Sequence, residues 1–547
     1  MFIDDQTYTV EGRTYRRVLL RNSYWKNGKV CHDTIANLSK CDNEEIKAIK
    51  FALANKKNLA GLKVPGKRVR TRQGLSVGVV WLLYQLAKRT GIVAALGRCR
   101  EARLALWMVI SAVIGSVSRL SATRLAQSHA ACDILGLDSF CEDNLYTALD
   151  WLDDQQQKIE KRLFKGRHQS NNMYLYDVTS SYLEGDQNEL ADWGYNRDGK
   201  KGKKQIVIGL LTNDEGRPIS CEVFRGNTRD PKTFKNQVDK VAQRFGIKEV
   251  TFVGDRGMIK SAQIKELSAE NYHYITALTK PEMETLLKSN VLQMELFDET
   301  VCEVESEGIR YIYRRNPVRV KEIRENRRDK LRRLRALCAQ KTRYLGGHPR
   351  AKVKVAKRIA EEKAEKLKID PWVNICVRGR ALSVEVKERA WEEEERLDGC
   401  YVIKTDLSVE TASKGTVHDR YKDLAKVEWA FRTMKTTLLH LRGIYVRKAK
   451  RTRAHVFTIM LAYLIAYELR RLWRDVEITI EEGIGELSSL CATEVIIGDV
   501  SIQTVPEPRE RGRILLEKAK VTLPEAIPCR RVNVFTRKKL VKERKVL

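Results

Sequence analysis

Three carboxylates stand at positions where an acidic side chain needs an explanation. Asp177 lies within the apolar run 174–179, which is typical of a buried strand, and Asp255 follows a second such run at 251–253. Glu428 lies later, in a segment with helical spacing. An aspartate directly after a strand is often only a cap or a turn residue, so neither aspartate is decisive alone. Together the three could share one site only beside cations, because neighbouring carboxylates raise one another's pKa.

Magnesium ions would supply that positive charge. Hard divalent cations are bound by carboxylate oxygens. Two such ions can activate a water or a 3′-hydroxyl and stabilise the leaving oxygen during displacement at a phosphodiester. The three carboxylates therefore point to metal-dependent phosphoryl transfer.

The segment around Glu428 predicts a helix that begins near Asp419. One face of this helix carries residues at spacings i, i+3, i+7, i+11 and i+14, namely Tyr421, Leu424, Glu428, Arg432 and Lys435. A second stripe, about 100° around the helix, is apolar and consists of Val427, Phe431, Met434 and Leu438. The apolar stripe is the expected core-facing side, so the polar face borders the core.

The elements that must position the two aspartates begin at residue 173, where the hydrophobic period changes from helical to strand-like. A meander of three strands is followed by helix, strand, helix and strand, a βββαβαβ order. The predicted strands cover residues 174–179, 205–211, 219–224, 249–253, 272–278 and 400–405, and a helix is predicted at 233–245. Asp177 thus lies on the first strand, and Asp255 follows the fourth, at the edge where α/β sheets bind ligands.

The chain as a whole is long and strongly basic. Its 547 residues exceed one ordinary core and suggest three or four units. The content of 43% hydrophobic residues excludes a disordered or low-complexity protein. Lys and Arg number 102 against 71 Asp and Glu, which gives a net charge of +31. A polyanion such as nucleic acid is therefore the expected partner.

Almost half of the excess charge lies in one stretch of the chain. Residues 319–368 contain 19 Lys or Arg against 6 Asp or Glu, inside an interruption of the strand pattern at 283–398. Sparse apolar positions predict a helical hairpin there that turns at 346–349. A solvated charged face and a DNA-facing surface both explain the charge, and its single sign favours the second. The arginines expected to contact DNA are Arg327, Arg328, Arg332 and Arg333.

Six segments are expected along the chain. They are a small N-terminal module (1–72), a helical DNA-binding domain (73–170), the first part of an α/β core (171–282), a basic insertion domain (283–398), the second part of the core (399–475) and a C-terminal region with a basic tail (476–547). The longest apolar runs, 104–117 and 456–469, are shorter than the roughly 20 residues that cross a bilayer, so buried helices are expected. The twelve cysteines contain no CxxC pair and are expected to be reduced thiols.

The combination of these motifs resembles the DDE transposases of bacterial insertion sequences. More narrowly, Tyr421-x2-Leu424-x3-Glu428-x6-Lys435 resembles the signature Tyr-x2-Arg-x3-Glu-x6-Lys of the insertion-sequence-four superfamily. The resemblance spans about residues 170–475, with weaker matches at 226–230 and 398–401. It implies an α/β fold with a ribonuclease H-like catalytic core and an inserted domain. A helical domain and a small strand-containing N-terminal module would precede this core.

The resemblance also implies an activity. Such an enzyme cuts at the ends of an insertion sequence and joins the 3′-hydroxyls to target DNA. Asp177, Asp255 and Glu428 would be its catalytic residues and metal ligands, for Mg²⁺ or in its place Mn²⁺, while Tyr421 and Lys435 would hold DNA. The implied partners are double-stranded DNA, as element ends and target, and a second copy of the chain in a synaptic homodimer. The implied location is the bacterial cytoplasm, at the nucleoid, without a membrane.

One position departs from the signature, because Leu424 stands where the family has arginine. A leucine cannot contact phosphate, so Arg432, about two turns further on, is expected to take over this contact. Reduced activity is the alternative. Two other functions stay open: a catalytically silent DNA-binding protein derived from such an enzyme, and a metal-dependent nuclease of the same fold.

Overall fold

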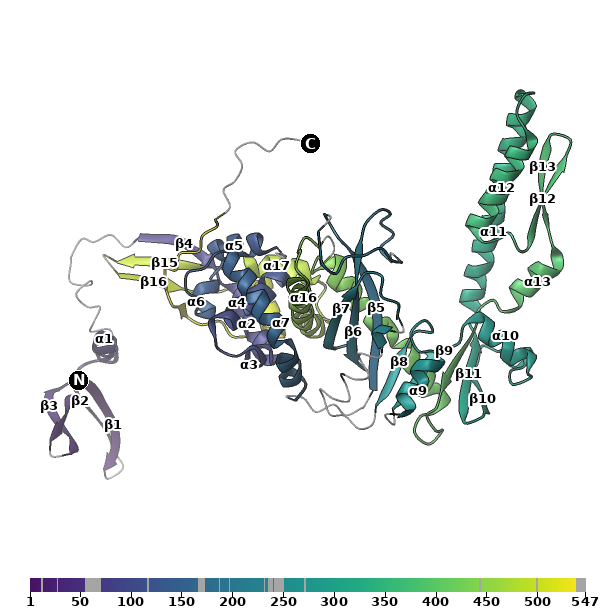
Figure 1. Ribbon diagram of the computed structural model, residues 1–547. Coiled ribbons are helices and arrows are strands. Elements are labelled where there is room, and N and C mark those ends of the chain that lie inside the picture. The colour runs from purple at the N-terminus through teal and green to yellow at the C-terminus, as the bar shows by residue number, and fades with distance from the viewer. Residues whose placement is uncertain are drawn as a thin grey trace. The chain divides into compact units, whose positions relative to one another are not determined.

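The computed structural model describes residues 1–10, 13–26, 28–54, 70–115, 118–165, 173–185, 187–195, 197–230, 232–234, 240, 250–269, 272–441, 444–497 and 500–537. The chain forms two compact units, each assembled from separate stretches of sequence. The first consists of Met1–Gln85, Thr123–Cys141 and Leu472–Leu547, and the second of Leu86–Ala122 and Glu142–Arg471. Helices and a large mixed sheet make the protein α/β (Figure 1).

The N-terminal module is a three-stranded antiparallel sheet with one helix. Strands β1 (Phe2–Val10), β2 (Arg13–Lys26) and β3 (Lys29–Asn37) pair in chain order, and α1 (Asn43–Ala54) follows them. The strands expected in the N-terminal module are thus present. Residues 55–69 lie outside the described residues.

The rest of the first unit contains a second small sheet. Its strands have the order β17-β16-β15-β4, formed by Ala526–Ile527, Val500–Thr504, Cys491–Ile497 and Arg70–Ser76. The strand β4 therefore pairs with a strand more than 400 residues later in the chain. The unit also holds α6 (Ala131–Leu135), α17 (Ile480–Ser488) and α18 (Glu510–Lys518), while α2 (Gly78–Arg89) and α5 (Arg119–Ser128) cross from one unit to the other.

The two long apolar runs form buried helices in the second unit, α4 (Arg100–Ile114) and α16 (Ala449–Leu472), as predicted; residues 116–117 of the first run lie outside the described residues. Helices α3 (Ile92–Leu96) and α7 (Glu142–Lys165) accompany them. Three ion pairs connect α7 to the beginning of α16: Asp154 with Lys450 at 2.7 Å, Asp150 with Arg451 at 2.8 Å and Asp153 with Arg453 at 2.7 Å. Among the described residues, no single helix is long and apolar enough to cross a membrane; one bent pair, Arg100–Ile114 with Arg119–Ser128, passes on length and composition alone.

The large sheet of the second unit has the strand order β10-β11-β14-β9-β8-β5-β6-β7. Its members are β5 (Met173–Tyr182), β6 (Gln205–Asn213), β7 (Pro218–Arg225), β8 (Thr251–Gly254), β9 (His273–Ala277), β10 (Cys302–Ser306), β11 (Ile309–Arg315) and β14 (Cys400–Thr405). Strands β5, β6 and β7 form the antiparallel meander, whereas β5, β8 and β9 run parallel. All six predicted strands are found among the described residues; residue 249, the first of the predicted strand 249–253, lies outside them. The predicted helix at 233–245 falls largely outside the described residues; α9 (Ser261–Ala269) separates β8 from β9.

Buried aromatic side chains hold this sheet together. Tyr174 and Tyr176 on β5, Phe252 on β8 and Tyr274 on β9 share one hydrophobic cluster with Phe234. The rings of Phe234 and Phe252 meet edge to face, with centroids 5.3 Å apart. The strand that carries Asp177 is therefore fixed on its apolar side by large rings.

Residues 283–398 contain more than the predicted hairpin. After α10 (Lys280–Lys288), strands β10 and β11 extend the large sheet, because Ile312 and Tyr313 are buried and β11 pairs with β14. The sequence pattern did not predict these two strands. Helices α11 (Pro317–Gly347) and α12 (Val353–Leu367) then form the predicted helical hairpin, beside the ribbon β12 (Val373–Arg378) and β13 (Ala381–Val386) and helix α13 (Glu388–Arg396) (Figure 1). This part has a hydrophobic cluster of its own around Leu334, Ala360 and Trp372.

Candidate active site

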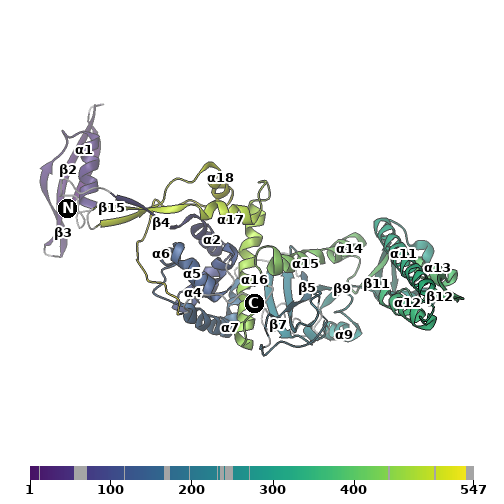
Figure 2. The ribbon, with the colours of Figure 1, turned by 90° about the horizontal axis from the view of Figure 1, so that it is seen from above.

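The helix that carries Glu428 is made of three short pieces. They are α14 (Lys414–Lys422), α15 (Leu424–Arg432) and a π-helical turn at Thr433–Thr437, where the sequence predicts one continuous helix. Ser413 caps the first piece, because its side chain accepts a hydrogen bond from the backbone N–H of Thr416. Figure 2 shows α15 near β5 and α14 near β9, and α14 also contacts β14. The predicted apolar stripe is buried as expected: Val427, Phe431, Met434 and Leu438.

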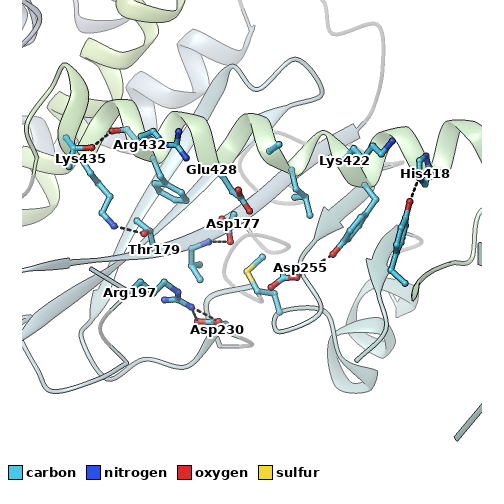
Figure 3. A pocket seen from close by; sticks show the side chains of 18 of the residues that line it. Asp177, Thr179, Arg197, Asp230, Asp255, His418, Lys422, Glu428, Arg432 and Lys435 are labelled. Atoms are coloured by element: carbon cyan, nitrogen blue, oxygen red, sulfur yellow. Dashed lines mark hydrogen bonds and ion pairs between the residues drawn. The ribbon is translucent and has the colours of Figure 1, made fainter. Parts of the chain in front are cut away.

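The polar face of the helix, beside the apolar stripe, borders a pocket of about 720 Å³. Asp177 enters it from β5, Asp255 from the turn after β8, and Glu428 from α15. Figure 3 shows Glu428 pointing from its helix toward the strand of Asp177, with Asp255 on the same side. The predicted polar face of the helix lines the same pocket, with Tyr421, Leu424, Arg432 and Lys435. Residues far apart in sequence are thus brought to one cavity.

Burial and neighbouring groups both affect the ionisation of Asp177. Its Oδ1 accepts a hydrogen bond of 2.7 Å from the backbone N–H of Val178. Burial raises the pKa of Asp177 to about 7, and the negative charges of Asp255 and Glu428 add to this increase. The Val178 N–H and Arg197 act in the opposite direction. A cation placed among the three would relieve the repulsion between them.

Asp255 is held by its own turn and by the helix. Its Oδ1 accepts a 2.8 Å hydrogen bond from the backbone N–H of Arg256 and a longer one, 3.5 Å, from the hydroxyl of Tyr421. Burial raises the pKa of Tyr421, and the charge of Asp255 raises it further, so this phenol stays a hydrogen-bond donor. Tyr421 therefore contacts one of the carboxylates in this structure.

Lys435 is buried, and its ammonium group lies between protein oxygens. Its Nζ is 2.7 Å from Oδ1 of Asp198 and donates to Oγ1 of Thr179 at 2.8 Å. Arg432, by contrast, is exposed at the same pocket. Of the two cations on the predicted polar face, Arg432 is thus the one open to an incoming ligand, whereas Lys435 ties the helix to the segment between β5 and β6.

The sequence pattern did not predict a second ion pair at the pocket. Nη2 of Arg197 lies 2.8 Å and 2.7 Å from the two carboxylate oxygens of Asp230 (Figure 3). Asp230 lies within the segment 226–230, which the resemblance includes as a weaker match. Arg197 and Asp198 lie in an irregular connection between two strands, where no periodicity singles them out.

The structure corrects one of the four arginines predicted to contact DNA. Arg327 is buried against Asp398 and makes two hydrogen bonds to its carboxylate, of 2.8 Å and 2.6 Å. Its guanidinium also lies over the ring of Trp391. The prediction for Arg327 was wrong, because the sparse apolar stripe of α11 includes this position. Arg328, Arg332 and Arg333 are exposed, and the last two pair with Asp329.

The oxygen donors around the pocket are of the type that binds hard cations, but they are not drawn tightly together. In the part of the chain that the structure describes, no group of three or more His, Cys, Asp or Glu side chains is close enough to hold one metal ion. Ions that take one or two carboxylates each and complete their shells with water or phosphate oxygens need no such group. The donor set fits ions of that kind.

Comparison with known families decides what this pocket belongs to. Residues 168–465, more than half of the chain, match the family described as the transposase DDE domain. The chain belongs to the DDE transposase family. Its residues 6–62 match the N-terminal domain of IS1634 family transposases, which places this DDE transposase in an insertion-sequence family. The range that matches the transposase DDE domain, residues 168–465, contains all three carboxylates and the basic helical hairpin.

Other comparisons are more distant. A cryo-EM structure of the piggyBac transposase synaptic complex with hairpin DNA is similar to the chain over 75% of each protein, with 9% sequence identity and a TM-score of 0.37. No match to a curated protein was found. As a member of its family, this DDE transposase is a DNA transposase, and DDE transposases generally depend on divalent metal ions.

Proposed function

We propose that this transposase cuts DNA at the ends of an insertion sequence and joins the freed 3′-hydroxyls to target DNA, with Asp177, Asp255 and Glu428 as its catalytic residues. The observation that carries the proposal is the single pocket into which β5, the turn after β8 and α15 each deliver one carboxylate. Two strands and a helix would have no structural reason to point three mutually repelling charges at one cavity. A cation-binding function supplies that reason.

The proposed core is ribonuclease H-like. It would comprise β5–β9, with the meander β5-β6-β7 on one side of β5 and the parallel strands β8 and β9 on the other. The segment between β9 and α14 would be its inserted domain, built around α11 and α12. The six domain boundaries given above remain part of this proposal.

Mg²⁺, or Mn²⁺ in its place, would be held by Asp177, Asp255 and Glu428 and would activate the attacking oxygen and stabilise the leaving one. The negative charges of Asp255 and Glu428 both raise the pKa of Asp177, so a bound cation would favour the ionised form of Asp177.

The cations of the pocket would bind the DNA backbone. Arg432 is exposed there and would make the phosphate contact that Leu424 cannot make. Tyr421 would orient Asp255 and bind DNA from the same position. Lys435 would act near the scissile phosphate only if its pair with Asp198 opened; in the present arrangement it positions the β5–β6 connection.

The test uses the purified protein with duplexes that carry the ends of its own element and a target duplex, in Mg²⁺ or Mn²⁺. Sequencing gels should show new 3′-hydroxyls at the ends and products joined to the target. Cleavage without joined products would indicate a nuclease of the same fold. Binding without cleavage would indicate a silent DNA-binding relative, and sedimentation of the DNA complex would show whether two copies hold two ends.

A further inference from the structure

The connection between β5 and β6 exposes two large aromatic rings beside the pocket. Trp193 is 59% exposed and Tyr195 is 82% exposed. Large rings left in solvent are unusual, because they forgo the free energy of burial, and such rings often mark binding surfaces. We call Trp193 and Tyr195, together with the described backbone of residues 192–195 and 197–198, the aromatic segment.

The backbone that presents these rings is fixed at its beginning. Asp192 and Gln205 exchange two backbone hydrogen bonds, of 3.1 Å and 3.0 Å. Gly194 passes so close to Gly226 that a Cβ on Gly194 would lie 2.2 Å from the Gly226 carbonyl oxygen. Any larger residue at position 194 would push the segment outward. Trp193 is therefore displayed from an immobilised backbone.

The end of the aromatic segment is fixed by the pocket itself. The backbone N–H of Arg197 donates to Oγ of Ser180 at 2.9 Å, and its guanidinium pairs with Asp230. Asp198 pairs with the buried Lys435. Arg197 and Lys435 both line the pocket of the three carboxylates, so the end of the aromatic segment is attached to residues of that pocket.

The sequence after the rings is rich in lysine. It continues as Lys200-Lys201-Gly202-Lys203-Lys204, and Lys201 is exposed. The Arg197 guanidinium lies over the Tyr195 ring at 5.9 Å from its centroid. Flat rings followed by exposed lysine fit a ligand that has both aromatic faces and phosphates. In duplex DNA the base faces are already stacked on one another, so the rings fit unpaired bases.

We propose that the aromatic segment stacks unpaired bases of the DNA strand whose phosphate enters the pocket. This proposal rests on the proposed function for the position of the phosphate, but the stacking itself needs no cleavage. A fixed backbone lowers the entropy lost when the bases bind, which suits a site that must hold a separated strand in register.

The experiment measures binding of a short single strand that carries 2-aminopurine, whose fluorescence falls when it stacks. It is done with the full chain in EDTA, so that no metal-dependent step contributes. Trp193→Ala and Tyr195→Ala should each weaken single-strand binding about 5- to 150-fold and reduce the quenching, while duplex binding stays unchanged. Trp193→Phe should keep the quenching, and Trp193→Leu, which keeps apolar volume without a ring, should lose it.

Two further variants separate stacking from other effects. Tyr344→Ala removes a 52% exposed ring that already stacks on His348, and it should leave the quenching unchanged. Lys201→Gln should reduce the salt dependence of binding without changing the quenching at saturation. Wild-type quenching in the Trp193→Ala, Tyr195→Ala double variant would overturn the proposal, as would altered self-association with unaltered DNA binding.

Failure of this proposal and of the proposed function are distinguishable. Trp193-dependent quenching in a protein that never cuts its own element ends would retain the stacking site and remove the transposition chemistry. Normal cutting and joining with no Trp193-dependent quenching would retain the transposition chemistry and remove the stacking site.

Discussion

At the scale of single residues, the pocket brings negatively charged side chains together where they are partly shielded from water. Burial alone disfavours an ionised Asp177, and two neighbouring carboxylates disfavour it further. Such an arrangement costs folding free energy, which proteins tolerate at sites where function needs it. Substitutions that remove the carboxylate charge but keep the side-chain volume separate the cost in folding free energy from the function.

The first prediction concerns the three carboxylates. Asp177→Asn, Asp255→Asn and Glu428→Gln should each abolish cleavage of element ends, because each removes a cation ligand with little change in volume. DNA binding in EDTA should stay within a factor of about two of wild type, since no direct phosphate contact is lost. Gel assays of cleavage and fluorescence anisotropy measure the two effects.

The control for this prediction is thermal unfolding in metal-free buffer. Asp177→Asn should unfold at a temperature no lower than wild type, because it removes a buried and repelled charge. Wild-type turnover in any of the three variants would remove that residue from the catalytic set.

The second prediction uses a histidine outside the pocket. His455 is buried on α16 beside the buried Arg119, whose Nη2 lies 3.5 Å from its Nδ1. Burial, together with the smaller effect of the Arg119 charge, lowers the pKa of His455 to about 3. The folded protein thus keeps His455 neutral, whereas the unfolded chain protonates it below about pH 6.5.

Stability should therefore fall as the pH decreases from about 6.5 toward 3, by up to about 1.4 kcal/mol per pH unit from this residue. His455→Gln should remove that part of the slope. Urea unfolding between about pH 7 and about pH 5 measures it, and parallel curves for wild type and variant would show that His455 contributes nothing.

At the scale of elements, α11 shows how one helix divides its cations between structure and surface. Asn316 caps its beginning by accepting hydrogen bonds from the backbone N–H groups of Val318 and Arg319. Its buried face includes Leu331 and Leu334, and Arg327 joins that face through its pair with Asp398. The remaining arginines face solvent, where they can track phosphates.

The third prediction tests those exposed arginines. Replacing Arg328, Arg332, Arg333 and Arg335 with Gln should lower the slope of log affinity against log salt by roughly 3 to 4, at about 0.9 per lost duplex contact. Binding measured across a salt series gives the slope. If the slope barely changes, the hairpin carries only a solvated charged face.

Arg327→Gln is the matched control for the hairpin. It breaks a pair in which both side chains are buried, at 6% and 4% exposure, so it should destabilise the protein by about 3–5 kcal/mol. The salt slope of the folded variant should remain that of wild type. The contrast separates a structural arginine from its neighbours on the same helix.

At the scale of the whole molecule, distant parts of the sequence complete the same sheets. In the first unit, β4 begins at Arg70 and pairs with β15, whose Cys491 lies opposite Ser76. The N-terminal module of β1–β3 and α1 has a sheet of its own and precedes this strand. A truncation that removes the module must therefore end before Arg70.

The fourth prediction follows from that boundary. Deleting residues 1–69 should abolish discrimination between the element's own ends and random DNA, while non-specific binding persists, because base readout and backbone contacts use different parts of the chain. Competition binding with both kinds of duplex measures the ratio. Unchanged discrimination would exclude the module from end recognition, and a deletion through Ser76 should instead unfold the first unit's sheet.

Much of the core could be predicted from local patterns. The strand of Asp177 is an unbroken apolar run, and the helix of Glu428 repeats Val427, Phe431 and Met434 at helical spacing, so both elements follow from side-chain periodicity. Their order along the chain, with the resemblance of Tyr421-x2-Leu424-x3-Glu428-x6-Lys435, was enough to indicate the family. Strands β10 and β11 were missed because about half of each is charged or polar and because β14, the strand that joins β11 to the large sheet, lies far along the chain.

The sequence by itself determined which residues could carry the chemistry and which elements bear them, since both depend on neighbours within a few turns or strands. Only the tertiary structure decided how their charges are used. Arg327 and Arg328 are adjacent and chemically identical, yet Arg327 is buried in an ion pair with Asp398, whereas Arg328 is exposed to solvent. Lys435 matches a signature, yet Asp198 holds it. The physical reason is that burial and ion pairing are set by partners distant in sequence, and no local periodicity encodes them.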